Sequence, residues 1–322
     1  MDKRHLFSRA LLFVAMVLLL GVAQARANVF SDFNEKEQQL YQNAIHFMDN
    51  GMVDTGIDLL KGLDKAHPSN WAVVHEIVYG YIVKQDYEEA YQWAKKLLKL
   101  KDAGADSYVI AGNAFDHVGK RKEAIEIYEK GLKKFPNSAR LWVEKGNKAY
   151  MMKNYDESVG CYEHAIDVDP NYDASYYRLA NLYAMSTDPV WAVMYAQNYQ
   201  LHASKYERLM EMGKLIYDLY RENVTRKDGK WEVTFTKKVN LSAYASLDCD
   251  LPYNGFFYYT HKVVLDEGGF AGDTLTLADV ARLHRKYVEI ADTTAHDYYN
   301  VPVLDMERAA LHEGHLEGYI MW

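Results

Sequence analysis

Four histidines near the end of the sequence are the residues best suited to metal chemistry. They cluster with three carboxylates between positions 284 and 317; the set is His284, His296, His312, His315, Asp297, Glu313 and Glu317. His312 and His315 are three residues apart, so on a helix they would share one face and could chelate a metal ion. The zinc-protease pattern His-Glu-x-x-His, however, is one residue longer than His312-Glu313-Gly314-His315. The spacing therefore favours scattered surface or capping histidines, with a metal site at His312 and His315 as the alternative.

Other catalytic motifs are absent from the sequence. It contains no phosphate-binding loop, no Gly-x-Ser-x-Gly elbow and no Cys-x-x-Cys pair. We therefore expect a protein without a cofactor and without enzymatic activity. The alternative is a metal-dependent enzyme with its site in residues 280–320.

Three asparagines recur at a fixed interval. Asn113, Asn147 and Asn181 are evenly spaced along the chain. An amide side chain both donates and accepts hydrogen bonds, as does the backbone of an extended peptide at regular intervals. The asparagines are therefore candidates for holding a peptide. Alternatively, each bonds to a neighbouring helix or loop and stabilises the structure.

The same interval runs through the front half of the chain. Small residues and prolines recur in this register, at Gly56, Ala90, Ala124, Ser158 and Ala192 and at Pro68, Pro136 and Pro170. Such a period, about 34 residues long, is the signature of stacked helical hairpins. Five segments each read as helix, turn and helix: 37–70, 71–104, 105–138, 139–172 and 173–206.

The third segment shows the pattern most clearly. Its first helix carries an apolar stripe at spacing i, i+3, i+4 and i+7, made of Tyr108, Ala111, Gly112 and Phe115. A facing stripe on its second helix ends before Pro136, as expected where a proline follows a helix. Within each segment, the pattern predicts two antiparallel helices.

This pattern resembles the tetratricopeptide repeat: a large residue, an apolar residue and Gly or Ala, then a small and an aromatic residue, then proline. The resemblance covers residues 37–206 without an insertion. It departs at Thr187, where a turn glycine is usual, and at Pro189, which we expect in the first turn of the last second helix. The resemblance implies a right-handed α-solenoid whose concave wall binds other proteins and seldom carries chemistry.

Helical geometry indicates which wall is free. Numbering each segment from its first residue, positions 4, 7, 8 and 11 pack together, and position 9, which the three asparagines occupy, points away from them. Further peptide-binding candidates on this wall are Tyr150, Met151, Tyr177, Arg178 and Met185. This row of asparagines resembles the asparagine ladder with which tetratricopeptide proteins hold bound peptides. The family's carboxylate clamp is mostly missing, because Val109 and Val143 stand where its first lysine would be.

The repeat period stops near residue 223. Residues 28–36 lead into the repeats, and 207–223 predict a helix that caps them. The last part, 224–322, predicts a small α+β domain. Period-two alternation indicates strands at 231–235 and 239–247, with a further strand candidate at 256–265; helices are expected from Thr276 and from about Asp305 to Gly318.

The first 27 residues read as a secretory signal peptide. A basic start precedes a 14-residue apolar run, Ala10 to Ala23, and small residues that suit cleavage stand at Ala25 and Ala27. The run is short for a membrane span, although an uncleaved anchor is the alternative. We therefore expect a periplasmic or secreted protein. Cys161 and Cys249 could be joined after export or remain as free thiols.

Charge argues against nucleic acid as a partner. The chain has a formal net charge of −8, and loss of residues 1–27, with four basic residues and one acid, takes it to −11. Such a chain repels phosphate backbones. The sequence as a whole predicts a protein-interaction module or assembly scaffold that binds an extended peptide or partner segment. Self-association through residues 224–322 is a further alternative.

Overall fold

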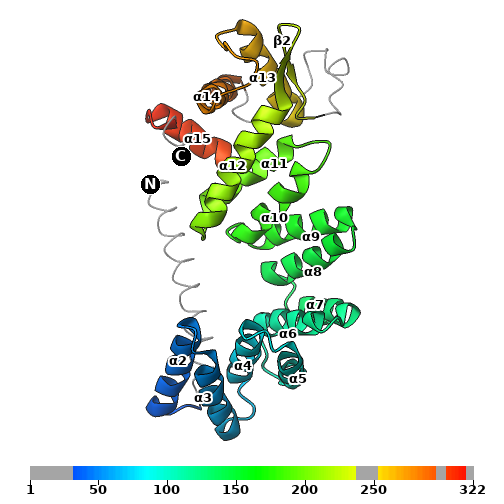
Figure 1. Ribbon diagram of the computed structural model, residues 1–322, viewed down its shortest axis with the longest axis vertical. Coiled ribbons are helices and arrows are strands. Elements are labelled where there is room, and N and C mark those ends of the chain that lie inside the picture. The colour runs from blue at the N-terminus through cyan, green and yellow to red at the C-terminus, as the bar shows by residue number, and fades with distance from the viewer. Residues whose placement is uncertain (1–31, 237–252, 295–301, 317–322) are drawn as a thin grey trace, which may run out of the picture. The chain divides into compact units, whose positions relative to one another are not determined.

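The computed structural model describes residues 32–236, 253–294 and 302–316 (Figure 1). The predicted signal peptide, the strand candidate at 239–247, Cys249 and His296 lie outside these residues. The chain divides into two compact units, Met1–Lys148 and Ala149–Trp322, and each is described by itself.

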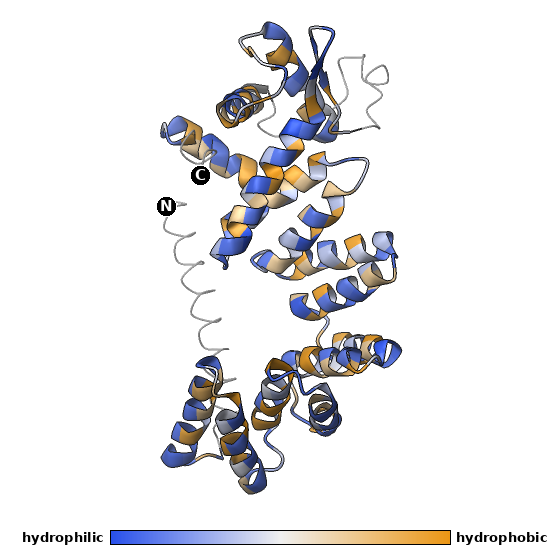
Figure 2. Ribbon diagram, viewed as in Figure 1, coloured by the Kyte–Doolittle hydropathy of each residue, from blue (hydrophilic) through white to orange (hydrophobic). Residues whose placement is uncertain are grey.

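Paired helices confirm the mainly helical fold and its five hairpins (Figure 1). In chain order, the helices of the five segments are α2 (Glu35–Asp49) and α3 (Val53–Ala66), α4 (Trp71–Val83) and α5 (Tyr87–Leu97), α6 (Ala105–His117) and α7 (Arg121–Lys134), α8 (Ala139–Met151) and α9 (Tyr155–Val168), and α10 (Asp173–Ala184) and α11 (Val190–His202). The additional helix expected at 207–223 is α12 (Tyr206–Asn223). Hydrophobic and hydrophilic residues alternate along these helices in Figure 2, as apolar stripes require.

The turns inside the first four hairpins each contain one residue in the left-handed region. The residue at position 15 has a φ of 81° at Gly51, 64° at Gln85, 80° at Gly119 and 61° at Lys153. Glycine adopts this conformation at little cost, which explains its use at two of the four turns. The fifth hairpin departs as expected at its turn, but Pro189 is the N-cap of α11 and does not lie in its first turn.

Two glycines allow α6 and α7 to approach each other closely. A Cβ added to Gly112 of α6 would lie 2.2 Å from Cε1 of Tyr128 in α7. A Cβ added to Gly131 of α7 would lie 2.8 Å from Cβ of Tyr108 in α6. Both tyrosines are buried. Each helix thus presents a glycine to the aromatic ring of its partner, and the pair interlocks.

Partly buried ion pairs join successive hairpins of the first unit. The Nζ atom of Lys96 lies 2.5 Å from Oδ1 of Asp64, and Nζ of Lys148 lies 2.5 Å from Oδ2 of Asp116. Burial raises the pKa of the Asp116 carboxyl, but the hydrogen bonds and charges of Lys148 and Arg121 outweigh that effect and hold it below its ordinary value. This ion pair therefore stabilises the unit at neutral pH and loses its contribution as the pH falls through the lowered pKa.

The part after residue 223 combines one β-hairpin with three helices. Strands β1 (Val224–Lys227) and β2 (Lys230–Val233) are antiparallel and joined through Asp228 and Gly229, both with positive φ. The helices are α13 (Tyr253–Glu267), α14 (Leu277–Thr294) and α15 (Pro302–His312). The helix predicted from Asp305 to Gly318 begins earlier and ends earlier, before Gly314 with a φ of 77°.

The strand predicted at 256–265 is wrong, because these residues lie within α13. Their buried positions follow helical spacing: Phe256, Phe257, Thr260, His261, Val264 and Leu265. A continuous apolar run does not distinguish a strand from a buried helix by periodicity. Burial of one helical face decides the conformation here.

The core of the second unit continues across residue 223. Tyr220 of α12 packs edge-on against Phe235, with ring centroids 5.1 Å apart, and lies near Phe257 of α13. Val190 and Val193 of α11 belong to the same cluster. The last hairpin, α12 and the C-terminal helices therefore share one hydrophobic core.

The packing of Gly112 leads to a stability prediction. Gly112→Ala places a methyl group against the Tyr128 ring, so we expect the free energy of unfolding to fall by about 2 kcal/mol. Gly62→Ala is the matched control: Gly62 is exposed within α3 and an added Cβ meets nothing within 4 Å. Because alanine favours helix, the control should be neutral or stabilising. Urea unfolding checks both, and equal stability of the two variants would contradict the packing argument.

Candidate functional site

The first two predicted asparagines already bond inside their own hairpins. The Tyr128 hydroxyl donates to Oδ1 of Asn113 over 2.6 Å. Burial raises the pKa of Tyr128, so this hydroxyl keeps its proton and remains a donor. Nδ2 of Asn147 donates to Oε2 of Glu144, one turn earlier on α8, over 3.2 Å. Both asparagines are half-buried, and Asn113 joins the two helices of its hairpin, whereas Asn147 bonds within α8.

The third asparagine is more accessible. Asn181 is exposed on α10, and its Nδ2 donates to the backbone oxygen of Tyr177 over 2.8 Å. The Tyr177 hydroxyl donates to Oε2 of Glu211, and the Arg208 guanidinium lies 4.6 Å from the centre of its ring. Since both partners belong to α12, the capping helix covers much of this tyrosine. Arg178 beside it is exposed.

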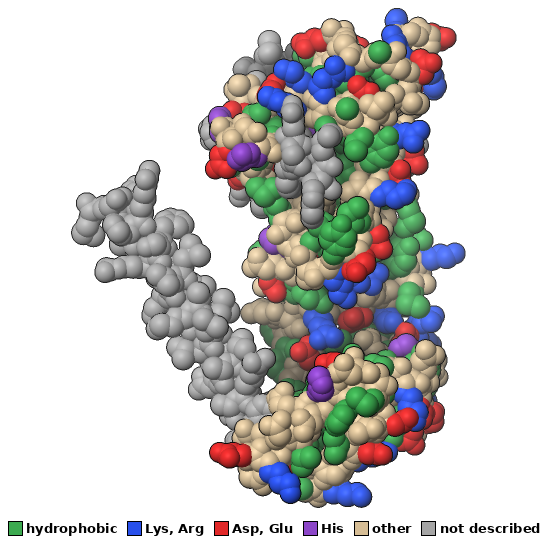
Figure 3. All heavy atoms as spheres, turned by 60° about the vertical axis from the view of Figure 1, so that its left-hand side comes forward, with side chains coloured by type: hydrophobic (Ala, Val, Ile, Leu, Met, Phe, Trp, Pro, Cys, Tyr) green, Lys and Arg blue, Asp and Glu red, His purple; other side chains and the backbone are tan. Residues whose placement is uncertain are grey.

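Apolar side chains of the second unit are exposed where its hairpins turn. We call five of them the Tyr–Met edge: Tyr150 (39% exposed), Met151 (50%), Met152 (62%), Tyr155 (48%) and Met185 (67%). Four of the five stand where α8 ends and α9 begins, and the rings of Tyr150 and Tyr155 are 5.8 Å apart. Met151 and Met185 occupy equivalent positions in successive repeats. Figure 3 shows hydrophobic patches among charged side chains on one face of the molecule.

The predicted histidine pair does not form a chelating site. His312 ends α15 with its side chain 67% exposed, and its Nε2 lies 3.2 Å from Oδ2 of Asp292. His315 follows the end of the helix, beyond Gly314, and is exposed. Within residues 32–236, 253–294 and 302–316, no group of three or more His, Cys, Asp or Glu side chains is arranged to hold a metal ion.

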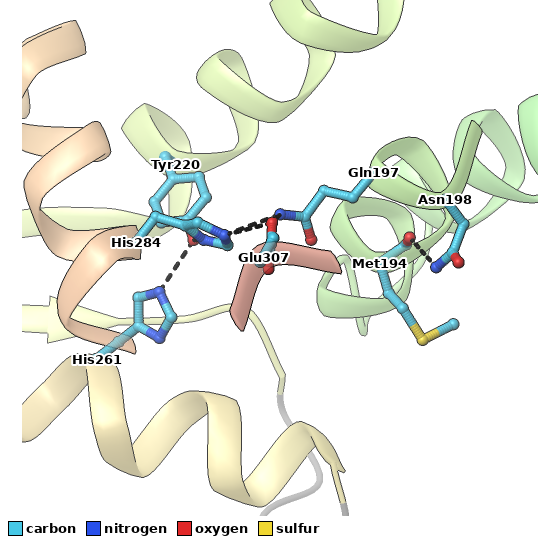
Figure 4. Close-up of polar contacts among 7 residues, drawn as sticks. All are labelled: Met194, Gln197, Asn198, Tyr220, His261, His284 and Glu307. Atoms are coloured by element: carbon cyan, nitrogen blue, oxygen red, sulfur yellow. Dashed lines mark hydrogen bonds and ion pairs between the residues drawn. The ribbon is translucent and has the colours of Figure 1, made fainter. Parts of the chain in front are cut away.

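A buried chain of polar side chains joins five helices of the second unit instead (Figure 4). It consists of Gln197 on α11, Tyr220 on α12, His261 on α13, His284 on α14 and Glu307 on α15, and each is at most 6% exposed. Oε1 of Glu307 lies 2.9 Å from both Nε2 of His284 and Nε2 of Gln197. The Tyr220 hydroxyl lies 3.2 Å from Nδ1 of His284 and 3.0 Å from Nε2 of His261.

The direction of each hydrogen bond can be deduced by starting at the His261 end of the network. Nδ1 of His261 lies 2.7 Å from the Phe257 carbonyl oxygen, which only accepts, so Nδ1 carries a proton. Burial lowers the pKa of His261 to about 3, against the hydrogen bond to Phe257, so the ring is neutral and its Nε2 accepts from Tyr220. The Tyr220 oxygen in turn accepts from Nδ1 of His284. Every polar atom along this path has a defined role.

The remaining contact, between His284 and Glu307, needs a proton of its own. Nε2 of Gln197 lies 3.0 Å from Nε2 of His284 and 2.9 Å from Oε1 of Glu307, so these atoms form a nearly equilateral triangle. The two N–H bonds of an amide diverge by roughly 120°, so Gln197 satisfies only one of the two atoms well. One proton shared by His284 and Glu307 completes the network.

Sequence reasoning missed this network because its members are far apart in the chain. Gln197 and Glu307 are separated by 110 residues. The only local signal was the helical spacing around His261, which the strand interpretation concealed. Of the grouped histidines that the structure describes, His284 alone enters the network. None of the helices that the structure describes is long and apolar enough to cross a membrane.

Comparison with known proteins identifies the repeats. The tetratricopeptide repeat family matches residues 105–137, 139–172 and 161–204. The chain therefore contains tetratricopeptide repeats, modules that typically act as protein-interaction scaffolds. The comparison with curated proteins found no match.

Several solved structures are similar to the repeat region. A thermophilic tetratricopeptide protein in Thermus thermophilus has 14% identity and a TM-score of 0.49, with 56% of this chain and 98% of that chain covered. PilW, a widely conserved type IV pilus biogenesis factor, has 15% identity, a TM-score of 0.48, and coverage of 57% and 87%. MamA has 20% identity, a TM-score of 0.42, and coverage of 53% and 96%.

The buried network leads to a second stability prediction. Glu307→Ala leaves Nε2 of both His284 and Gln197 without their partner in a site closed to water. We expect the free energy of unfolding of the second unit to fall by about 3 kcal/mol. Glu307→Gln keeps the shape and offers hydrogen bonds to both neighbours, so it should cost less than the alanine variant.

Thermal unfolding followed by circular dichroism and tyrosine absorbance provides the measurement. Glu313→Ala is the control, because Glu313 is exposed just beyond the same helix. We expect it to change stability by less than about 0.5 kcal/mol. A Glu307→Ala variant as stable as this control would show that the network contributes nothing.

Proposed function

We propose that the chain is an exported scaffold that binds an extended segment of a partner protein along the first helices of its repeats. The signal-like segment at residues 1–27 supports export. The tetratricopeptide repeats support the inference that the partner is a protein. Exposed apolar residues on the described surface indicate what kind of segment binds. We infer that this segment carries apolar side chains.

The Tyr–Met edge is the observation that carries this proposal. Soluble proteins bury most large apolar side chains, and a contiguous exposed group marks an interaction site. Tyrosine contributes a large apolar ring at low entropic cost, whereas methionine adapts its shape to different partners. The edge therefore suits apolar side chains that vary in size and spacing.

Polar groups beside the edge fit the backbone of such a segment. Asn181 uses Nδ2 for the Tyr177 carbonyl, and no donor to its Oδ1 is found among the described residues. Its oxygen can therefore accept an N–H group of a bound peptide. Arg178 offers a cation three residues earlier. Asn113 and Asn147, which bond within their hairpins, play the smaller part in this proposal.

A peptide-binding experiment tests the proposal. The probes are peptides selected from a random display library for binding to residues 28–322. Fluorescence polarisation gives their dissociation constants. Met151→Ser combined with Met185→Ser should weaken binding at least about tenfold, because two apolar contacts are lost. Asn181→Ala should weaken the same peptides by a smaller factor.

The chain offers a closely matched control. Met52 and Met210 are 47% and 49% exposed but lie outside the Tyr–Met edge. Met52→Ser combined with Met210→Ser should leave the dissociation constants unchanged. Equal weakening in both double variants, or unchanged binding in the Met151 and Met185 variant, would place the binding surface elsewhere.

A further inference from the structure

Lysines stand in one row at the ends of the second helices. Lys65, Lys99 and Lys133 occupy equivalent positions in the first three repeats, and all three are exposed. Lys65 and Lys133 lie in the last turns of α3 and α7, and Lys99 follows Leu98, the C-cap of α5. No ion-pair partner for any of them is found in the described part of the chain. We call these three residues the lysine row.

In the fourth hairpin, the residue at this position is acidic instead of basic. Asp167 takes the equivalent place in the last turn of α9, which contains no basic residue. Glu163 lies one turn earlier and Asp169 is the C-cap, and the three form what we call the acidic end of α9. Carboxylates at this end of a helix interact unfavourably with the helix dipole, whereas lysines are stabilised by it. The interaction of these carboxylates with the helix dipole is thus unfavourable, and a cation from another molecule would offset it.

The contacts of the acidic end leave charge available. Glu163 accepts a hydrogen bond from the Tyr195 hydroxyl, and Asp169 accepts one from the backbone N–H of Asn171. For Asp167, no partner is found among the described residues, and its side chain is exposed. A carboxylate in this position remains free to meet a lysine.

The surrounding sequence extends both charges. Residues 95–148 contain thirteen Lys or Arg against seven Asp or Glu, and residues 149–188 contain two against seven. The lysine row therefore ends in a positive region, while the acidic end stands in a negative one. Fields of opposite sign act on an approaching molecule over about 10 Å at moderate salt.

We propose that the lysine row of one copy of this chain binds the acidic end of α9 of a second copy. Every copy carries both surfaces and the surfaces differ, so the contact is heterologous and builds a head-to-tail assembly. A single exposed ion pair contributes little to binding, so several must act together. The assembly is accordingly weak and sensitive to salt.

Sedimentation velocity of residues 28–322 tests this contact. The wild-type chain should associate at about 20 mM salt and become monomeric at about 500 mM salt. Lys99→Glu with Lys133→Glu should be monomeric at both, and so should Asp167→Lys. An equimolar mixture of these two variants at low salt should form a 1:1 dimer, because one intact lysine row then meets one intact acidic end.

A control variant carries the same change in charge at other sites. Lys36 and Lys122 are exposed outside the row, so Lys36→Glu with Lys122→Glu should associate like the wild type. A monomeric wild type at low salt, or variants that stay monomeric when mixed, would overturn the proposal. Vesicles containing phosphatidylglycerol form a second arm. If a monomeric wild type binds them and the Lys99 and Lys133 variant does not, the row serves an anionic membrane instead.

Discussion

The close approach of paired helices is the constraint on which the rest of this structure depends. Gly112 and Gly131 let α6 and α7 come near enough for Tyr128 and Tyr108 to fill the space between them. A Cβ on either glycine would force the helices apart. Since the turn between them fixes the register, each repeat meets the same kind of packing requirement at the same interval along the chain. The period in the sequence therefore follows from the close packing of paired helices.

This constraint also decides where other residues can act. Because packing occupies most of each first helix, only some positions remain for a partner, and local hydrogen bonds take part of these. Asn113 illustrates the competition, since its oxygen serves the buried hydroxyl of Tyr128. At the end of the array no further hairpin covers α11 and α12. The C-terminal helices take that place and extend the core, and the network around His284 satisfies the polar groups buried there.

The repeat region was largely predictable from sequence because each of its contacts joins neighbouring segments at a fixed interval. The five hairpins, the additional helix at 207–223 and the turn departure at Thr187 follow from that interval alone. The C-terminal part was less predictable. Its apolar run at 256–265 suits a strand or a buried helix, and its polar network joins residues without a shared period. The exposed Tyr150, Met151 and Met185 could be assigned to a wall by helical geometry, whereas the local bonds of the asparagines depend on side-chain distances.

The distance in sequence between Gln197 and Glu307 has a consequence for the order of folding. In the described part of the first unit, the main contacts join neighbouring hairpins, so each can fold as soon as the next one is available. The second unit cannot close its polar network until α15 has left the ribosome, or has crossed the membrane if the chain is exported. Until then the apolar faces of α11 and α12 and the side chains of Gln197 and Tyr220 lack their covering helices. The interval before α15 becomes available is thus the one in which this protein most needs protection from aggregation.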